Sequence, residues 1–392
     1  MRTRKQVYLD YSASTPVDPR VIDAMLPYFG EVYGNPSSAH KFGSRAERAI
    51  EDARMTVAGI LNCQPSEVVF TSCGTESDNL AIRGAGWSAR HRGAPSRLVT
   101  SPIEHSAVTN TVNQMDELMG FDTEIAPVDK FGIVDSEIFG EACKCGGALA
   151  SVIYASNELG TIQDLPLLSQ IAHAHDMLMH TDAVQAGGQL DLDVERLGVD
   201  MLSLSAHKFY GPKGVGLLYV KDGLELAPSQ SGGGHEHGLR AGTHNTAFIV
   251  GMAKALELAY DEKDERLRHF TKMRDHLIQG ISDRLSCAEL SGHPDRRLPS
   301  HASFVLHGID ANALMMHLDM HGVAGSSGSA CKTGNPEPSE SLLAVGYSED
   351  EAKSGLRLSV GAQTTEDDIS YALDVLERAA EKLGKLKREM AP

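Results

Sequence analysis

The sequence predicts an α/β protein in which helices cover both faces of a mostly parallel sheet. Short apolar runs of strand length alternate with longer stretches in which apolar residues recur every three or four positions. Polar residues typical of ligand sites follow several of the apolar runs. Because ligands of open α/β sheets bind beyond the carboxyl ends of the strands, this pattern also predicts where a site lies.

The alternation runs through the first half of the chain. In residues 45–61 one helical face carries Ala46, Ala49, Ile50, Ala53, Val57 and Ile60, which predicts an amphipathic helix. Strand, polar loop and helix are predicted in turn over 67–82 and again over 97–108; strands ending in polar residues are predicted over 148–160 and 177–185, and two strands joined by a polar turn over 199–220.

The second half changes character after about residue 255. Residues 253–285 are charged and amphipathic, which predicts one long helix linking two domains. Strand-like segments follow at 302–308 and 354–361, and a helix capped by Thr364 or Thr365 closes the chain. At 392 residues the chain is long enough for two domains.

Composition excludes several classes of protein. The net charge of −17 argues against nucleic-acid binding. No apolar run reaches the length of a membrane span, and the first twelve residues lack the apolar core of a signal peptide, so we expect a cytoplasmic protein. Six cysteines in so long a chain do not form a disulfide framework, and Cys143 and Cys145 have the wrong spacing for zinc.

Lys208 is the first candidate for chemistry. It follows the apolar segment 201–206 and precedes the apolar segment 215–220, so it is expected to be partly buried. A single lysine is most often a solvated surface charge, but a buried one has a lowered pKa and can form a Schiff base with an aldehyde. Pyridoxal phosphate is the cofactor that such a lysine suggests.

The phosphate of that cofactor needs a cradle of donors. Gly74 and Thr75 stand ahead of a predicted helix, whose free N–H groups favour an anion. Ser205 and His207, on either side of the turn before Lys208, can add side-chain donors.

The pyridine ring makes three further demands. Asp182, a carboxylate at a strand end, fits opposite the ring nitrogen. His105 can stack on the ring, and Gln185 can donate to the phenolic oxygen. Each residue alone is more often a loop residue or a helix cap, but the ordered set predicts a pyridoxal phosphate site.

These residues lie within motifs that extend along nearly the whole chain, from about residue 7 to 370. They are "YLDYSASTPVDPRV", "GNPSSAH", "TESDNLAI", "NELGTIQDL", "HTDAVQ", "SAHKFYGPKGVGLLYV", "GGGHEHGLRAGTHN", "SSGSAC" and "LRLSVG". Their order resembles cysteine desulfurases of the NifS/IscS type, which are fold type I pyridoxal phosphate enzymes of the class V aminotransferase group. The resemblance implies a large cofactor-binding domain over 16–255 and a small α+β domain from 1–15 and 256–392, with a cysteine loop at about 325–340.

The resemblance also assigns roles. It implies that Asn157 lies beside cofactor and substrate and that Arg357 clamps the substrate carboxylate, assisted by Asn35. Thr243 would reach the phosphate of the neighbouring subunit, which implies a homodimer. Cys331, in the glycine- and serine-rich segment "GSSGSACKTGNPEP", would be the nucleophile.

The implied reaction takes sulfur from L-cysteine and releases L-alanine. Lys208 would bind the cofactor and remove the α-proton, and His105 would stack on the ring and help to move protons. Cys331 would carry the sulfur as a persulfide to an acceptor, such as an iron–sulfur scaffold or a tRNA thiolation enzyme. No direct contact with nucleic acid is implied.

Two positions depart from the family's usual pattern. Cys73 stands where the family has glycine, and His237 stands where relatives often have arginine. The segment "HEH" offers two histidines without a third ligand, so no metal is expected. Alternatives are a selenocysteine lyase, a cysteine sulfinate desulfinase, an ordinary aminotransferase, or a non-catalytic sulfur carrier or scaffold.

Overall fold

The computed structural model describes residues 5–327 and 338–390, with side chains as far as residue 384. Its larger sheet has the strand order β2-β8-β7-β6-β5-β3-β4. The strands are β2 (Val68–Thr71), β3 (Arg97–Thr100), β4 (Asp122–Ile125), β5 (Leu149–Ser151), β6 (Leu178–Asp182), β7 (Met201–Ser205) and β8 (Gly216–Val220). Only β8 runs antiparallel to its neighbours, so the other six strands of this sheet end at the same edge.

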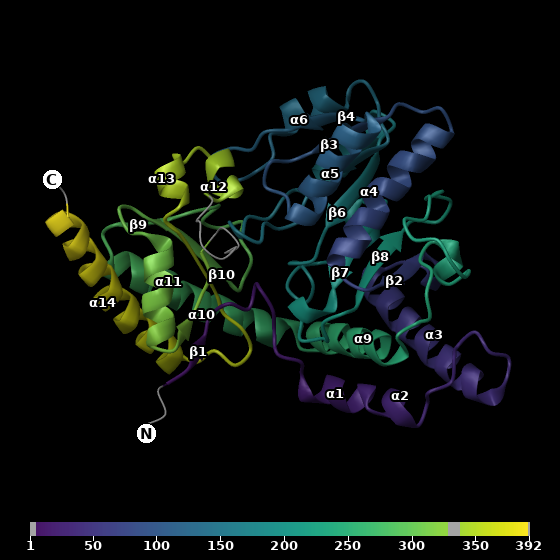
Figure 1. Ribbon diagram of the computed structural model, residues 1–392, viewed down its shortest axis with the longest axis horizontal. Helices are drawn as coiled ribbons and strands as arrows, with labels where there is room; N and C mark the ends of the chain where they lie inside the picture. Colours follow the sequence, from purple (N-terminus) through teal and green to yellow (C-terminus); the bar gives the residue numbers. More distant parts are fainter. Residues whose placement is uncertain (1–4, 328–337, 391–392) are drawn as a thin grey trace.

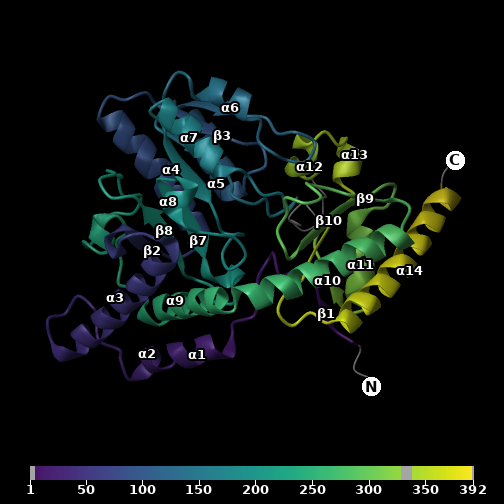
Figure 2. The same ribbon diagram turned by 180° about the vertical axis from the view of Figure 1, so that it is seen from behind.

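Helices cover both faces of this sheet, as predicted (Figures 1 and 2). In β2, Val69 packs into one hydrophobic cluster while Val68 and Phe70 pack into another, because successive strand residues face opposite sides. The first cluster includes α4 (Gly74–His91) and α5 (Ser106–Met119); the second includes α3 (Lys41–Leu61), α6 (Ser136–Cys143), α7 (Leu165–Ala174) and α9 (Thr246–Asp261).

The second part of the fold has its own hydrophobic core. The antiparallel sheet β12-β10-β9 comprises β12 (Gly355–Ser359), β10 (His301–Leu306) and β9 (Ala288–Leu290), and β1 (Val7–Tyr8) pairs in parallel with β11 (Val323–Ala324). Against them pack α10 (Lys263–Arg284), α11 (Ala311–Met320) and α14 (Glu366–Met390). The first and last elements that the structure describes, β1 and α14, both belong to this part (Figure 1).

The single long helix predicted for 253–285 is wrong. The segment forms the end of α9 and all of α10, which meet at Glu262. The backbone of Glu262 (φ −99°, ψ 10°) departs from helical values, while its carboxylate accepts hydrogen bonds from Arg20 and Arg266. The apolar periodicity continues through the break, so the pattern did not reveal it.

The remaining elements are short. They are α1 (Pro19–Met25), α2 (Pro27–Gly30), α8 (Val194–Leu197), α12 (Glu340–Ala344), α13 (Glu349–Ala352) and the 3-10 turns η1 (Pro65–Glu67), η2 (Ala206–Lys208) and η3 (Glu236–Gly238). Of the two expected caps of α14, Thr365 accepts a hydrogen bond from the Asp368 N–H at 3.2 Å. None of the helices described combines the length and apolar character that a membrane span requires.

Candidate active site

A cavity of about 360 Å³ lies where β2, β3, β5, β6 and β7 end. Ten of the residues predicted from sequence line it: Gly74, Thr75, His105, Asn157, Asp182, Gln185, Ser205, His207, Lys208 and Arg357. Nine come from the segments at the strand ends of the larger sheet, and Arg357 comes from β12 of the other sheet. The cavity therefore lies between the two parts of the fold.

Lys208 closes the turn η2 that follows β7. Its Nζ donates to the Ser12 carbonyl at 2.5 Å and to the Ala13 carbonyl at 3.1 Å. Burial, followed by the charge of Arg357, lowers the pKa of Lys208 to about 8. More of this amine is thus neutral near pH 7 than in an exposed lysine, which favours a nucleophilic role.

The helix α4 begins at one end of the cavity with free N–H groups. Its N-cap Cys73, which also lines the cavity, provides no side-chain hydrogen bond. A Cβ on Gly74 would lie 2.7 Å from Cγ2 of Val184 and 3.5 Å from Cβ of Ser205, so glycine lets the helix start this close to the strand ends. Burial, with the charge of Lys208 next, lowers the pKa of His207 to about 4, so its ring is neutral. This end suits an anion.

Asp182, at the end of β6, places a carboxyl group in another part of the cavity. Its Oδ1 accepts from the Val184 N–H at 2.9 Å. Burial raises its pKa, whereas the charges of His105 and Lys208 act in the other direction. The Nδ1 atom of His105 accepts from the Ala107 N–H at 3.1 Å, so the neutral ring carries its proton on Nε2.

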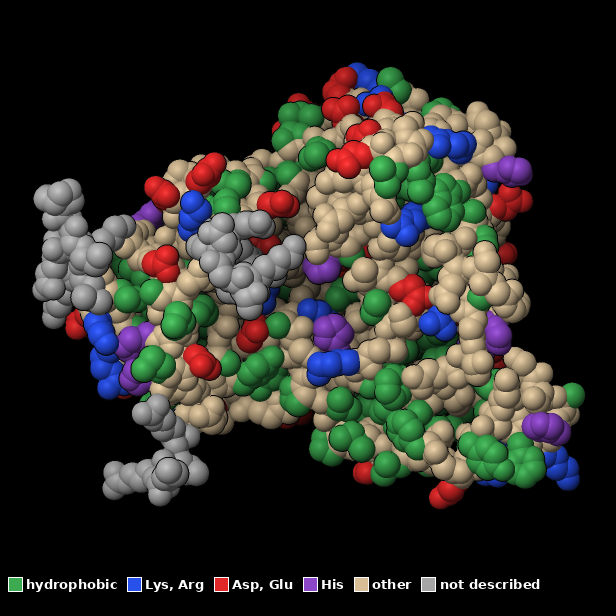
Figure 3. Space-filling view, in the orientation of Figure 1, with side chains coloured by type: hydrophobic (Ala, Val, Ile, Leu, Met, Phe, Trp, Pro, Cys, Tyr) green, Lys and Arg blue, Asp and Glu red, His purple; other side chains and the backbone are tan. Residues whose placement is uncertain are grey.

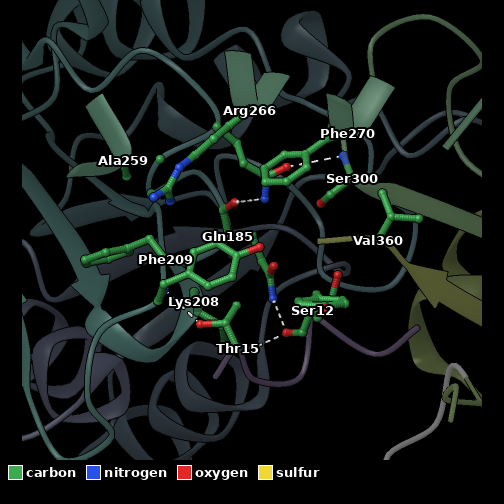
Figure 4. A pocket seen from close by; sticks show the side chains of 15 residues that line it. Ser12, Thr15, Gln185, Lys208, Phe209, Ala259, Arg266, Phe270, Ser300 and Val360 are labelled. Atoms are coloured by element: carbon green, nitrogen blue, oxygen red, sulfur yellow. Dashed lines mark hydrogen bonds between the residues drawn. The ribbon is translucent and has the colours of Figure 1, made fainter. Parts of the chain in front are cut away.

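The Ser12 carbonyl connects Gln185 with Lys208. Gln185 Nε2 donates to it at 2.9 Å, and Lys208 donates to the same oxygen. Figure 4 shows these side chains at a second hollow of about 20 Å³, where Arg266 and Phe270 of α10 also lie. The N-terminal segment therefore forms part of the wall between the two parts of the fold.

Arg357 is fixed at the cavity wall by two partners. Its Nη2 bonds to Asp10 Oδ1 at 3.1 Å, and its Nη1 donates to the carbonyl of Asn157 at 3.1 Å. Its Nε is buried without a partner among the residues that the structure describes. A guanidinium held in this way presents a fixed fork to a carboxylate.

Asn35 and Thr243 do not line this cavity. They lie together on a separate, more open hollow of about 610 Å³, with His235 and His244. The prediction that Asn35 assists Arg357 is therefore not met within one subunit.

The "HEH" segment does not assemble a metal site in the described part of the chain. Glu236 turns inward and pairs with Arg54, and His237 has a left-handed backbone (φ 57°). Among the side chains described in 5–327 and 338–384, the only three His, Cys, Asp or Glu residues whose ligand atoms lie within 4.8 Å of one another are Asp78, His105 and Asp182, at the cavity already described.

Sequence reasoning missed several residues of the site, and one predicted residue lies outside the description. Asp10, Ser12 and Asp78 contribute to the site or to its walls. Asp78 was detectable in principle, because it lies four residues after Gly74 and so on the same face of a helix. Cys331 falls in 328–337, outside the described residues.

Comparisons with known proteins show which family the chain resembles. The family model described as aminotransferase class V matches residues 7–372. A cysteine desulfurase IscS from Dictyoglomus turgidum is 42% identical over 380 residues, covering 97% of this chain and 96% of the relative. A solved NifS-like protein superposes with a TM-score of 0.90 at 35% identity, covering 97% of this chain and 100% of that one. SspA in complex with cysteine does so with a TM-score of 0.80 at 34% identity, covering 92% and 100%.

The chain belongs to the class V aminotransferase family. Within that family it is a member of the cysteine desulfurases of the NifS/IscS type, and its fold is the type I fold predicted from sequence.

Proposed function

We propose that this chain binds pyridoxal phosphate in the 360 Å³ cavity, takes sulfur from L-cysteine, releases L-alanine and holds the sulfur as a persulfide on Cys331. The observation that carries the proposal is the convergence of Lys208, Asp182 and Arg357 on one cavity from three separate segments. An amine, a buried carboxylate and a fixed guanidinium are the groups that an amino acid and this cofactor require together.

The donor set fits the cofactor. Gly74, Thr75, Ser205 and His207 would hold its phosphate at the start of α4, where the helix lacks a side-chain cap. Asp182 would face the ring nitrogen from within the buried end of β6. Pyridoxal phosphate supplies an aldehyde that bonds to amines and a ring that takes up an electron pair.

The protein's own groups bind substrate and move protons. Arg357 would hold the substrate carboxylate with Asn157 beside it, and Lys208 Nζ would take the α-proton. His105 would help to move protons at Nε2, which in the neutral ring carries the proton and donates a hydrogen bond.

Sulfur transfer balances without any external oxidant. The Cys331 thiolate forms an S–S bond with the substrate sulfur as the Cβ–S bond breaks. The electron pair of the broken bond stays with the three-carbon fragment, which takes up a proton and leaves as alanine. One cysteine and one Cys331 thiol thus give one alanine and one persulfide, which an acceptor such as an iron–sulfur scaffold or a tRNA thiolation enzyme then collects.

A homodimer is the second part of the proposal. Exposed apolar side chains gather over α1, α2 and the start of α3, in the lower part of Figure 3. They are Ile22, Leu26, Phe29, Tyr33 and Phe42. Contiguous apolar surface of this kind favours a protein interface. This apolar surface adjoins the hollow that Asn35 and Thr243 line, which supports a contribution of both residues to the partner subunit's cavity.

The variant Phe29→Glu tests the homodimer, because it places a charge on the apolar surface. It should yield monomers that bind the cofactor weakly.

Mass spectrometry of the cofactor-loaded protein tests the reaction. After incubation with L-cysteine without reductant, the Cys331 peptide should gain the mass of one sulfur atom, and alanine should appear. Cys331→Ser should keep the visible absorbance of bound cofactor and lose alanine formation. Full alanine production by that variant would instead favour a selenocysteine lyase or cysteine sulfinate desulfinase type of reaction.

A further inference from the structure

Asp78 is a buried carboxyl to which the proposed reaction gives no task. It lies in α4, lines the cavity and is 1% exposed. Its Oδ1 has no hydrogen-bond partner among the residues described. An unpartnered buried polar atom is unfavourable, so the fold bears a cost at this position.

Asp78 is close to Asp182, the carboxylate proposed to face the ring nitrogen. One oxygen of each carboxyl and one ring nitrogen of His105 all lie within 4.8 Å of one another. Two carboxyls at this separation, shielded from water, do not both ionise without a large cost. One of the pair must therefore hold a proton near neutral pH.

Burial raises the pKa of both carboxyls, but the surroundings of Asp182 oppose that rise more than those of Asp78 do. Asp182 accepts the Val184 N–H at 2.9 Å, and the charges of His105 and Lys208 oppose the effect of burial on its pKa. A cationic ring nitrogen would add to this stabilisation.

The surroundings of Asp78 favour its protonated form. His180 Nε2 lies 3.7 Å from Oδ1, but burial lowers the pKa of His180 to about 3, so that ring is neutral. The other titratable groups that face Asp78 are His105, which lies within 4.8 Å of it, and the acids Asp182, Glu104 and Cys73. Burial first, then the charge of Asp182, raises the pKa of Asp78 well above its ordinary value, with only a hydrogen bond from Ser203 acting against them.

We propose that Asp78 is a positioning residue that stays protonated beside Asp182 and makes Asp182 the ionised carboxyl of the pair. The O–H dipole of Asp78 stabilises the neighbouring negative charge, and its neutrality avoids a second charge at the same end of the cavity. The inference rests on the proposed role of Asp182 opposite the ring nitrogen of pyridoxal phosphate.

The test is the pH dependence of pyridoxal phosphate binding to the apoprotein, measured by equilibrium dialysis from pH 5 to pH 9. Affinity should fall on the acid side as Asp182 takes up a proton. Asp78→Leu keeps the side-chain branching but removes the dipole, so the acid midpoint should move up by about one pH unit. Asp78→Asn is neutral and retains a donor, so its midpoint should match that of the wild type. Asp182→Asn should abolish the part of the fall in affinity at low pH that comes from protonation of Asp182.

Three results would overturn the inference. An equal loss of affinity at every pH in Asp78→Leu, with an unchanged midpoint, would show that Asp78 only packs. If Asp78→Asn lost this fall in affinity at low pH as Asp182→Asn does, the negative charge of the pair would reside on Asp78. The comparison of these two asparagine variants tests the inference even if a thermal melt shows that Asp78→Leu does not fold. A wild-type protein that binds no pyridoxal phosphate at any pH would overturn the proposed function as well, which separates the two failures.

Discussion

Replacing Glu236 by glutamine should destabilise the fold more than any other single loss of charge on α3 or its partners. The Glu236 carboxylate is 1% exposed and accepts from both terminal nitrogens of Arg54, from the Phe70 N–H at 2.7 Å and from His244 Nε2 at 2.6 Å. An amide has one acceptor oxygen and turns its own NH₂ donor toward these donors. Arg54 is then left buried with only the exposed carboxylate of Glu51 as a counter-charge.

Two independent arguments give similar values for the loss of folding stability in Glu236→Gln. Burial alone would raise the pKa of Glu236, but the hydrogen bonds from His244 and Arg54 outweigh it and lower the pKa from 4.5 to about 2. That fall corresponds to about 3 kcal/mol of stability. Removal of one partner of a buried ion pair typically costs roughly 3–5 kcal/mol. Because the folded-state pKa is depressed, this stability is present above about pH 4.5 and is lost as the pH falls toward 2.

Urea unfolding at pH 7, followed by circular dichroism at one protein concentration, measures the loss. The matched control is Glu51→Gln, since Glu51 also pairs with Arg54, but its side chain is 54% exposed. Exposed pairs contribute about 0–1 kcal/mol, so the control should unfold almost as the wild type does. Equal unfolding free energies for the two variants would refute the reasoning.

Three further results are expected. Lys208→Ala should lose both the visible absorbance of bound cofactor and the release of alanine. Absorbance retained at the wild-type wavelength would show that Lys208 is not the amine that binds the cofactor. Arg357→Ala should raise KM for L-cysteine by about tenfold to a hundredfold, as expected for lost hydrogen bonds to a charged group, with a smaller effect on cofactor affinity, and the reverse order would contradict the clamp. Burial raises the pKa of Glu104 from 4.5 to about 8, so the wild type should lose stability as pH rises between these values. The free energy of unfolding of the non-ionising variant Glu104→Gln, measured relative to that of the wild type, should therefore increase from pH 5 to pH 8. A difference that stays constant over this range would show that Glu104 does not titrate in it.

The sequence predicted the larger sheet and most of its site because both depend on local patterns. Strands of three to five residues separated by amphipathic helices leave few other arrangements. Once the strands are parallel, the residues after them meet at one edge, and this places Thr75, His105, Asn157, Asp182 and Lys208 in one cavity without any knowledge of distances.

The remaining features depend on contacts between distant segments. The pairing of Asp10 with Arg357 joins residues 347 positions apart, and no local pattern encodes it. The break at Glu262 follows from a backbone change that leaves the apolar periodicity intact. Asn35 lines a different hollow from the cavity of its own subunit, and a linear motif does not show whether such a residue contributes to a partner's cavity instead. The domain boundaries at residues 15 and 255 stay predictions.

The two ends of the cavity handle buried charge in different ways. At the end proposed for the substrate, Arg357 pairs with Asp10, so the guanidinium is oriented before any carboxylate arrives. At the end proposed for the pyridine ring, Asp182 has no such ion pair with any residue that the structure describes; the titratable groups Asp78, His105 and Lys208 lie around it. A permanent ion pair suits a group that must recognise every incoming substrate in the same geometry. A cluster whose protons can be shared suits a carboxylate whose charge would have to match that of a bound cofactor, and this difference accounts for the ion pair at Asp10 and for the cluster of titratable groups at Asp182.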